Sequence, residues 1–137
     1  MKILVINGAN LNMLGKREPD IYGTKTLDEM NNELQVYAAP LGVELEFFQS
    51  NHEGEIIDKI HTGDDYDGIV INPAAHTHYS IAILDAIKAI KTPTIEVHLS
   101  SITERGRVSI THEACIDMFE GIGIDGYKKA IEKLSQI

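Results

Sequence analysis

Two residues able to share a proton, Glu96 and His98, stand two positions apart at the end of an apolar run that begins at Thr94. Residues two apart on a strand point to the same side of a sheet, so the two side chains are expected to lie together. A carboxylate beside an imidazole fixes its tautomer and stabilises its protonated form, which suits a general acid. A histidine with a purely structural role at a strand end is the alternative interpretation.

A candidate base lies in the long segment 7–23, NGANLNMLGKREPDIYG. Tyrosine acts as a base only when it is ionised, and a nearby guanidinium lowers its pKa from the usual value of about 10. Arg17 and Tyr22 could therefore remove a proton from a carbon next to a carbonyl group. The segment greatly exceeds the roughly two to six residues usual between a strand and a helix, which indicates a lid or a binding loop. A solvated loop in which Tyr22 only packs fits the same composition.

A pair of histidines, His76 and His78, flanks Thr77 in the segment 72–80, NPAAHTHYS. This spacing could bind a metal ion, or it could place hydrogen-bonding groups against the hydroxyls of a substrate. The plainer alternative is that Thr77 or Ser80 caps a helix and that the histidines are exposed. A metal-dependent hydrolase would draw its ligands from four residues: His76, His78, Glu96 and His98.

Five short apolar runs predict the strands that position these groups, at residues 3–6, 43–48, 69–71, 94–97 and about 116–119. Helical periodicity fills the intervals, at about 27–39, 55–62, 80–90 and 126–134. Thr26 and Glu29 form a capping-box pattern before the first helix, and Pro40 ends it. Asp85 lies off the apolar stripe of the third helix and is free to face outward.

Aliphatic runs separated by helices are typical of a parallel sheet that is covered on both faces. With right-handed crossovers, the prediction is an α/β fold, a flavodoxin-like three-layer sandwich with a five-stranded parallel sheet. A chain of 137 residues fits one domain, residues 1–137. Ligands bind beyond the carboxyl ends of the strands in such a sheet, and the polar segments stand at those ends. One active site is therefore expected there.

The charge balance narrows the class of partner. The chain has 12 basic and 21 acidic residues, a formal charge of −9, which argues against binding to nucleic acid or an anionic membrane. A small anionic substrate is compatible, because two segments hold cations that can make a pocket locally positive: Lys16, Arg17, Arg105 and Arg107. The only cysteine, Cys115, stands in an apolar stretch typical of a buried thiol. With no evident signal peptide and no apolar run of about 20 residues, a soluble cytoplasmic protein is expected.

Four segments taken together resemble the type II 3-dehydroquinate dehydratases, or type II dehydroquinases. Segment 7–23 resembles that family's lid, and QSNHEGEIIDKIH, NPAAHTHYSIAILDAI and PTIEVHLS follow in the family's order and spacing. The likeness runs from Lys2 to about Arg105 and resumes at 121–127, GIGIDGY. It implies a lyase of the shikimate pathway of aromatic amino-acid biosynthesis, which dehydrates 3-dehydroquinate to 3-dehydroshikimate through an enolate. It also implies no metal, no other cofactor, and a homododecamer built from trimers.

The resemblance assigns catalytic roles residue by residue. Tyr22 is the base that takes the proton next to the ketone, and Arg17 keeps it ionised and brings the lid over the substrate. Asn10 helps to stabilise the enolate through water. His98, oriented by Glu96, is the acid that protonates the departing hydroxyl.

Substrate binding is assigned to Asn72, His78, Asp85, Leu99, Ser100, Arg105 and Arg107. In this assignment Asp85 acts in the site of a neighbouring subunit. The family has two arginines after the fourth strand, and the second binds substrate. Counted forward from His98, Ser109 takes the place of that second arginine; counted back from Gly121, the segment is a few residues short. Either Arg105 or Arg107 is then expected to fill the role.

Three other functions compete with this interpretation. A metal-dependent hydrolase would lose activity with a chelator, whereas the dehydratase would not. A receiver-type signalling domain needs a phosphorylatable aspartate at the end of the third strand, where Asn72 stands. A Schiff-base dehydratase needs a buried lysine, and the lysines here fall mostly in helices or loops.

Overall fold

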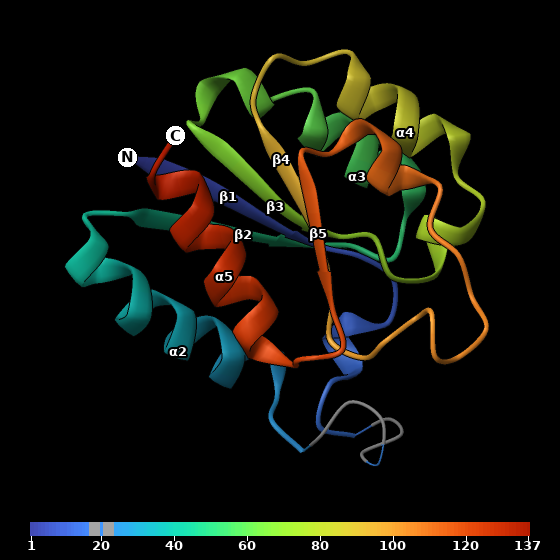
Figure 1. Ribbon diagram of the computed structural model, residues 1–137, viewed down its shortest axis with the longest axis horizontal. Helices are drawn as coiled ribbons and strands as arrows, with labels where there is room; N and C mark the ends of the chain where they lie inside the picture. Colours follow the sequence, from blue (N-terminus) through green and yellow to red (C-terminus); the bar gives the residue numbers. More distant parts are fainter. Residues whose placement is uncertain (17–19, 21–23) are drawn as a thin grey trace.

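A five-stranded parallel sheet forms the centre of the molecule. The structure is a computed structural model and describes residues 1–16, 20 and 24–137. The strands pair in parallel in the order β2-β1-β3-β4-β5 (Figure 1). They are β1 (Lys2–Asn7), β2 (Glu44–Gln49), β3 (Gly68–Asn72), β4 (Thr94–His98) and β5 (Asp117–Glu120). The predicted flavodoxin-like α/β sandwich is confirmed.

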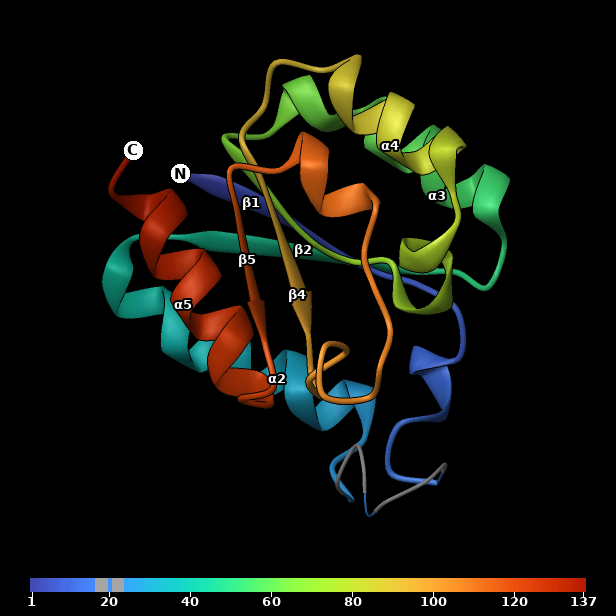
Figure 2. The same ribbon diagram turned by 45° about the vertical axis from the view of Figure 1, so that its right-hand side comes forward.

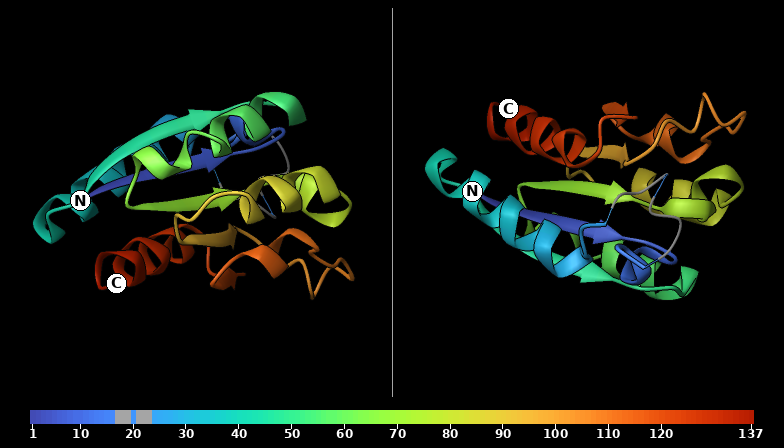
Figure 3. Two further views of the ribbon diagram at one scale, coloured as in Figure 1. Left: turned by 90° about the horizontal axis from the view of Figure 1, so that it is seen from above. Right: turned by 90° about the horizontal axis from the view of Figure 1, so that it is seen from below.

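Two layers of helices cover the sheet (Figure 3). The helices are α2 (Leu27–Ala38), α3 (Glu53–Ile60), α4 (Ile81–Lys88) and α5 (Ile124–Ser135). Ile3 and Val5 of β1 join a core with α2 and α5, while Leu4 and Ile6 join a second core with α3 and α4. Successive side chains of a strand face opposite sides, so burial on both faces requires the unbroken aliphatic run seen in the sequence.

The helix starts follow their capping residues. The Thr26 hydroxyl accepts the Glu29 N–H at 3.2 Å and the Glu29 carboxylate accepts the Thr26 N–H at 3.2 Å, so the predicted capping box is confirmed. Helix α2 ends at Ala38, just before a 3-10 turn that contains Pro40. Ser80 caps α4 by accepting the N–H of Ile83 at 3.0 Å. No helix in the described part of the chain is long and apolar enough to cross a membrane.

Three connecting segments gather at the carboxyl end of the sheet, the end away from the chain termini (Figure 2). They are η1 (Leu11–Met13), η4 (Ala74–His78) and the loop 99–110. A further 3-10 turn, η5 (Thr111–Ala114), lies beside α4 and leads into β5. The turns after β1 and β3 approach closely at Gly8, where an added Cβ would lie 2.6 Å from the carbonyl oxygen of Pro73. Only glycine fits this contact, which brings the β1 loop beside η4.

Candidate active site

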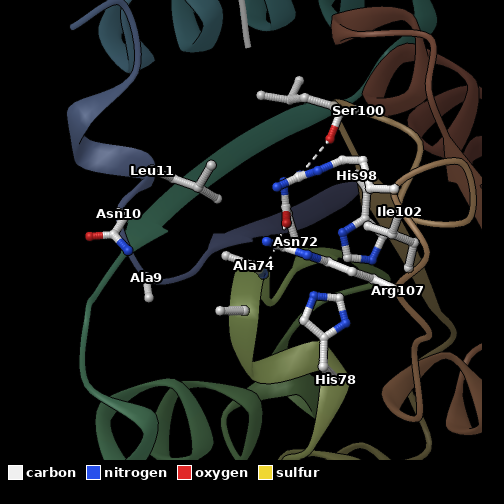
Figure 4. Close-up of a pocket in the computed structure, with 13 residues that line it drawn as sticks. Ala9, Asn10, Leu11, Asn72, Ala74, His78, His98, Ser100, Ile102 and Arg107 are labelled. Carbon is white, nitrogen blue, oxygen red and sulfur yellow. Dashed lines mark hydrogen bonds between the residues drawn. The ribbon is translucent and has the colours of Figure 1, made fainter. Parts of the chain in front are cut away.

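A pocket opens at the carboxyl ends of β1, β3 and β4, where the fold rule expects a ligand (Figure 4). About 510 Å³ of space lies among its lining residues, with the open solvent at its mouth included. Eight of the predicted residues line it: Asn10, Asn72, His78, His98, Leu99, Ser100, Arg105 and Arg107. Segments far apart in the sequence therefore form one site, as expected.

The Glu96–His98 pair stands at the end of β4. Nε2 of His98 lies 2.7 Å from Oε2 of Glu96, and both residues are buried, at 5% and 0% exposed. A carboxylate at this position requires the proton on Nε2, so Nδ1 is the ring nitrogen left to exchange a proton with a ligand. The predicted pairing of the two side chains is confirmed as a contact.

Three hydroxyl groups surround the Glu96 carboxylate. Thr77 Oγ1 and Ser109 Oγ lie 2.9 and 2.6 Å from Oε2, and Thr111 donates to Oε1. Burial raises the pKa of Glu96, but the hydrogen bonds from His98, Ser109 and Thr111 prevail, and the pKa stays below its usual value. Glu96 is therefore an anion at neutral pH although it is fully buried. This cluster was not predicted, because its members come from three separate segments of the chain.

Asn72 is held from both ends of its side chain. Its Nδ2 donates to the hydroxyl of Tyr127 at 3.0 Å, and its Oδ1 accepts the N–H of Ala74 at 3.0 Å. The Tyr127 hydroxyl donates its own proton to Oδ1 of Asn7 at 2.6 Å, so it can only accept from Asn72. One N–H of Asn72 is left for the pocket. Tyr127 was not a predicted site residue.

The two histidines of η4 have different environments. Nδ1 of His78 lies 2.6 Å from the carbonyl oxygen of Val108, so this nitrogen carries the proton and Nε2 accepts hydrogen bonds in the neutral ring. His76 is buried beside the ring of Tyr79, and its Nδ1 has no partner among the described residues. His76 does not line the pocket, and the expectation of two exposed histidines is wrong for it.

Across residues 1–16, 20 and 24–137, no group of three or more His, Cys, Asp or Glu side chains is arranged to hold a metal ion. The four residues of the hydrolase alternative make other contacts. His98 binds Glu96, His78 binds the Val108 carbonyl, and His76 does not line the pocket. No observation favours the metal-dependent hydrolase.

Both candidate arginines line the pocket, and Ser109 does not. Nη1 of Arg105 donates to Ser100 Oγ at 3.0 Å, and Figure 4 shows the Arg107 side chain extending into the pocket on the side of His78. A turn brings the Arg107 N–H to the carbonyl of Ile102 at 2.8 Å. The loop after β4 thus brings two guanidinium groups to the pocket.

Arg17 and Tyr22 fall outside the described residues. Asp85 is exposed on α4 and does not line the pocket of its own chain. Asn10 does line it, in a left-handed conformation with φ of 69°, and its N–H donates to Oδ1 of Asn51 at 2.9 Å. Asparagine adopts this conformation more readily than most residues.

Known proteins match the chain over its whole length. The family model described as Dehydroquinase class II matches residues 1–135. A 3-dehydroquinate dehydratase of Clostridium botulinum is 53% identical over 95% of this chain and 91% of its own length. One of Thermotoga neapolitana is 50% identical over 100% and 96%. The crystal structure of type II dehydroquinase from Butyrivibrio crossotus, 46% identical, has a TM-score of 0.94 and covers 98% of this chain and 97% of that one. This chain belongs to the class II dehydroquinase family.

Proposed function

We propose that this chain is a 3-dehydroquinate dehydratase that removes water from its substrate through an enolate. The observation that carries the proposal is the buried Glu96–His98 pair, whose imidazole lines a pocket shared with Arg105 and Arg107. The pair offers an acid for a departing hydroxyl, and the guanidinium groups offer charge for an anionic substrate. Family membership and the names of the relatives point to the same reaction.

The first step is loss of the proton on the carbon next to the ketone. Tyr22, as the phenolate, accepts this proton, and the electrons of the broken C–H bond move to the ketone oxygen to form the enolate. Arg17 keeps Tyr22 ionised. Asn10, which lines the pocket, helps to stabilise the enolate oxygen through a water molecule. The roles of Tyr22 and Arg17 rest on the likeness of segment 7–23 to the family's lid.

The second step expels the hydroxyl from the β-carbon. The enolate electrons return to form the new C=C bond as the C–O bond breaks, and Nδ1 of protonated His98 gives its proton so that water leaves. Glu96 stabilises the imidazolium before this transfer and holds Nε2 in place. Solvent then returns a proton to His98 and removes one from Tyr22, which restores the starting state.

The polar groups of the pocket match the substrate's functional groups. Arg105, Arg107 and the backbone at Leu99 and Ser100 hold the carboxylate. The remaining N–H of Asn72 donates to an oxygen on the ring, beside His98.

His78 provides the complementary contact on the ring. Its Nδ1–H is committed to the carbonyl of Val108, so its Nε2 accepts a hydrogen bond from a ring hydroxyl. Asn72 as donor and His78 as acceptor then distinguish the two sides of the ring.

Asp85 is proposed to act across a subunit contact, in a homododecamer built from trimers. Ile81 stands one helical turn before Asp85 on the same side of α4 and is 63% exposed, as is Tyr79. Large exposed apolar side chains beside an aspartate that faces away from its own pocket support a contact surface. Sedimentation of the active protein tests this, and a fully active monomer would contradict it. One domain, residues 1–137, and a cytoplasmic location complete the proposal.

Turnover of 3-dehydroquinate without added cofactor tests the function directly. The conjugated enone of the product absorbs in the ultraviolet, so the reaction is followed by absorbance. A chelator control separates metal-dependent chemistry, and borohydride treatment with substrate separates a Schiff-base route. Activity that survives both controls supports the proposal, whereas no turnover by the assembled protein contradicts it.

The base is tested by Tyr22→Phe, which deletes only the proton acceptor. Turnover is expected to fall by at least about 100-fold while substrate still binds, because a general base typically contributes that much or more. Turnover within about tenfold of wild type would mean that the base is a different residue.

A further inference from the structure

The hydroxyl of Ser109 shares an oxygen atom with the proposed acid. Ser109 Oγ lies 2.6 Å from Oε2 of Glu96, and the same Oε2 lies 2.7 Å from Nε2 of His98. Each donor draws on the negative charge of that oxygen, so two donors that share it are each bound less strongly than one donor alone. The strength of the Glu96–His98 bond therefore depends on Ser109.

The other hydrogen bonds of each hydroxyl group determine which one donates to Oε2 of Glu96. Ser109 Oγ accepts the N–H of His112 at 3.1 Å, which leaves its own proton for Glu96. Thr111 donates to the other carboxylate oxygen, Oε1. Thr77 has one proton and three oxygens within reach, those of Glu96, Ser109 and Thr111, at 2.9, 2.8 and 2.6 Å. Ser109 is thus the hydroxyl committed to the oxygen that faces His98.

Backbone carbonyl groups at Val108 and Ser109 anchor the chain segment that carries substrate contacts, and a change of the Ser109 side chain keeps them. Ser109 directly follows Val108, whose carbonyl oxygen accepts from Nδ1 of His78. Nδ1 of His112 lies 2.9 Å from the Ser109 carbonyl oxygen, which anchors the segment on its other side. Arg107, two residues before Ser109, lines the pocket. Counted forward from His98, Ser109 stands where the family resemblance expects an arginine, and its side chain binds the Glu96 carboxylate.

We propose that Ser109 is a positioning residue of the dehydration step. Its hydroxyl holds the Glu96 carboxylate and weakens the Glu96–His98 hydrogen bond, so that the imidazolium releases its proton readily. The proposal rests on the proposed function, since it assumes that His98 is the acid. It assigns to Ser109 no contact with the substrate. Its consequence is a change in the pH dependence of turnover rather than in substrate affinity.

Other charged or titratable groups around the pair must be counted as well. Among the described residues these are His78 on η4, Arg105 and Arg107 in the loop after β4, Cys115 after η5, and Glu120, which pairs in register with His98 on β5. The two arginines and Glu120 oppose one another in their effect on an imidazolium. All of these groups are kept when Ser109 is changed, so a shift on substitution reports the hydroxyl.

The test compares Ser109→Ala with Ser109→Thr and with a matched control, Ser50→Ala. Ser50 Oγ also donates to a glutamate, Glu55, and accepts a histidine N–H, that of His52 at 3.0 Å, but it does not line the pocket. The control therefore loses a bond to a carboxylate and a bond from a histidine N–H away from the acid, although Ser109 Oγ also has Thr77 Oγ1 at 2.8 Å. Values of kcat and KM for 3-dehydroquinate are measured against pH in the assembled protein.

The expected result for Ser109→Ala is a fall in kcat of about threefold to tenfold, with KM within about twofold and the alkaline limb of the kcat profile about half a unit to one unit higher. Ser109→Thr restores most of the rate because it keeps a hydroxyl. Ser109→Cys, whose thiol is a weaker donor, gives a smaller shift in the same direction and serves if the alanine variant does not fold. A pH profile identical to wild type, with only the stability loss seen for Ser50→Ala, overturns the proposal.

A readout without turnover separates this inference from the function. Of the two forms of an imidazole, diethyl pyrocarbonate modifies the neutral one. The rate of modification of His98, followed at that residue by peptide mass spectrometry against pH, therefore reports its proton affinity. The midpoint is expected at higher pH in Ser109→Ala than in wild type. If the midpoint shifts although the protein has no dehydratase activity, the effect of Ser109 on His98 is supported and the proposed function is contradicted. The same midpoint in wild type and Ser109→Ala would refute the effect of Ser109 on His98.

Discussion

The hydroxyl of Tyr127 accepts the side-chain N–H of Asn72 at 3.0 Å, which joins helix α5 to the floor of the pocket. Tyr127 is fully buried, and burial raises the pKa of its phenol, so it stays protonated. Its proton goes to Asn7 at 2.6 Å, which leaves the oxygen free only to accept. The amide of Asn72 is thereby oriented by a residue that does not line the pocket.

Tyr127→Phe is expected to lower kcat by about tenfold while KM changes less than about threefold, because Asn72 loses its fixed orientation. Stability should fall by about 1–3 kcal/mol, since two buried polar groups lose a partner. The control is Tyr37→Phe, whose hydroxyl bonds Glu132 at 3.0 Å on the surface. That variant should change stability by at most about 0.5 kcal/mol. Equal kcat in Tyr127→Phe and wild type would show that Asn72 needs no such support.

The sheet could be predicted from the sequence because burial on both faces demands continuous aliphatic runs. Ile3–Ile6 is such a run, and it became the centre of both cores. The Glu96–His98 pair could be predicted for a related reason, since a spacing of two on a strand fixes the direction of both side chains. Local rules were enough wherever one element determined the geometry.

Contacts between elements could not be predicted in this way. The sequence predicts Thr77 or Ser80 as the helix cap, and Ser80 is the cap, but nothing in the sequence predicts that Thr77 bonds the Glu96 carboxylate. Ser109 was considered only as the replacement of a substrate-binding arginine. Both reach Glu96 through loops whose paths depend on packing, and neither carries a periodic signal.

Arg107→Ala is expected to raise KM by about tenfold or more with a smaller effect on kcat, because a guanidinium bound to a carboxylate contributes about 1.5–3 kcal/mol. The KM of Arg107→Lys should lie between the values for wild type and Arg107→Ala, since an ammonium keeps the charge but not the forked geometry. The control is Lys129→Ala, an exposed cation on α5 that tests for a general effect of net charge. A normal KM in Arg107→Ala together with a raised KM in Arg105→Ala would assign the contact to Arg105 alone.

The hydrogen bonds of Glu96 predict how stability depends on pH. The pKa of Glu96 in the folded protein is below its usual value, so the unfolded chain takes up the proton first as the pH falls. The stability from this group is present above the unfolded value of about 4.3 and is lost as the pH falls through the folded pKa. The stability difference between wild type and Glu96→Gln should therefore shrink between about pH 7 and about pH 3.5. Urea unfolding at both pH values measures it, with exposed Glu113→Gln as the control, and a constant difference would contradict the assignment.

Ala74 holds a left-handed conformation, with φ of 55°, and this strain predicts an unusual stability effect. Its N–H donates to Oδ1 of Asn72, so the strained turn helps to fix a pocket residue. The left-handed conformation costs an L-residue about 1–2 kcal/mol of stability. Glycine avoids this cost, but its greater freedom in the unfolded chain lowers stability by about 0.4–1 kcal/mol. Ala74→Gly should therefore stabilise the fold by about 0.5 kcal/mol.

The neighbouring Ala75 provides the comparison, because its φ is not positive and the same substitution there brings only the entropic loss. Ala75→Gly should destabilise the protein by about 0.4–1 kcal/mol in urea unfolding. The two variants change the same atoms at adjacent positions and are expected to differ in sign. If Ala74→Gly loses as much stability as Ala75→Gly, the turn after β3 is not strained at Ala74.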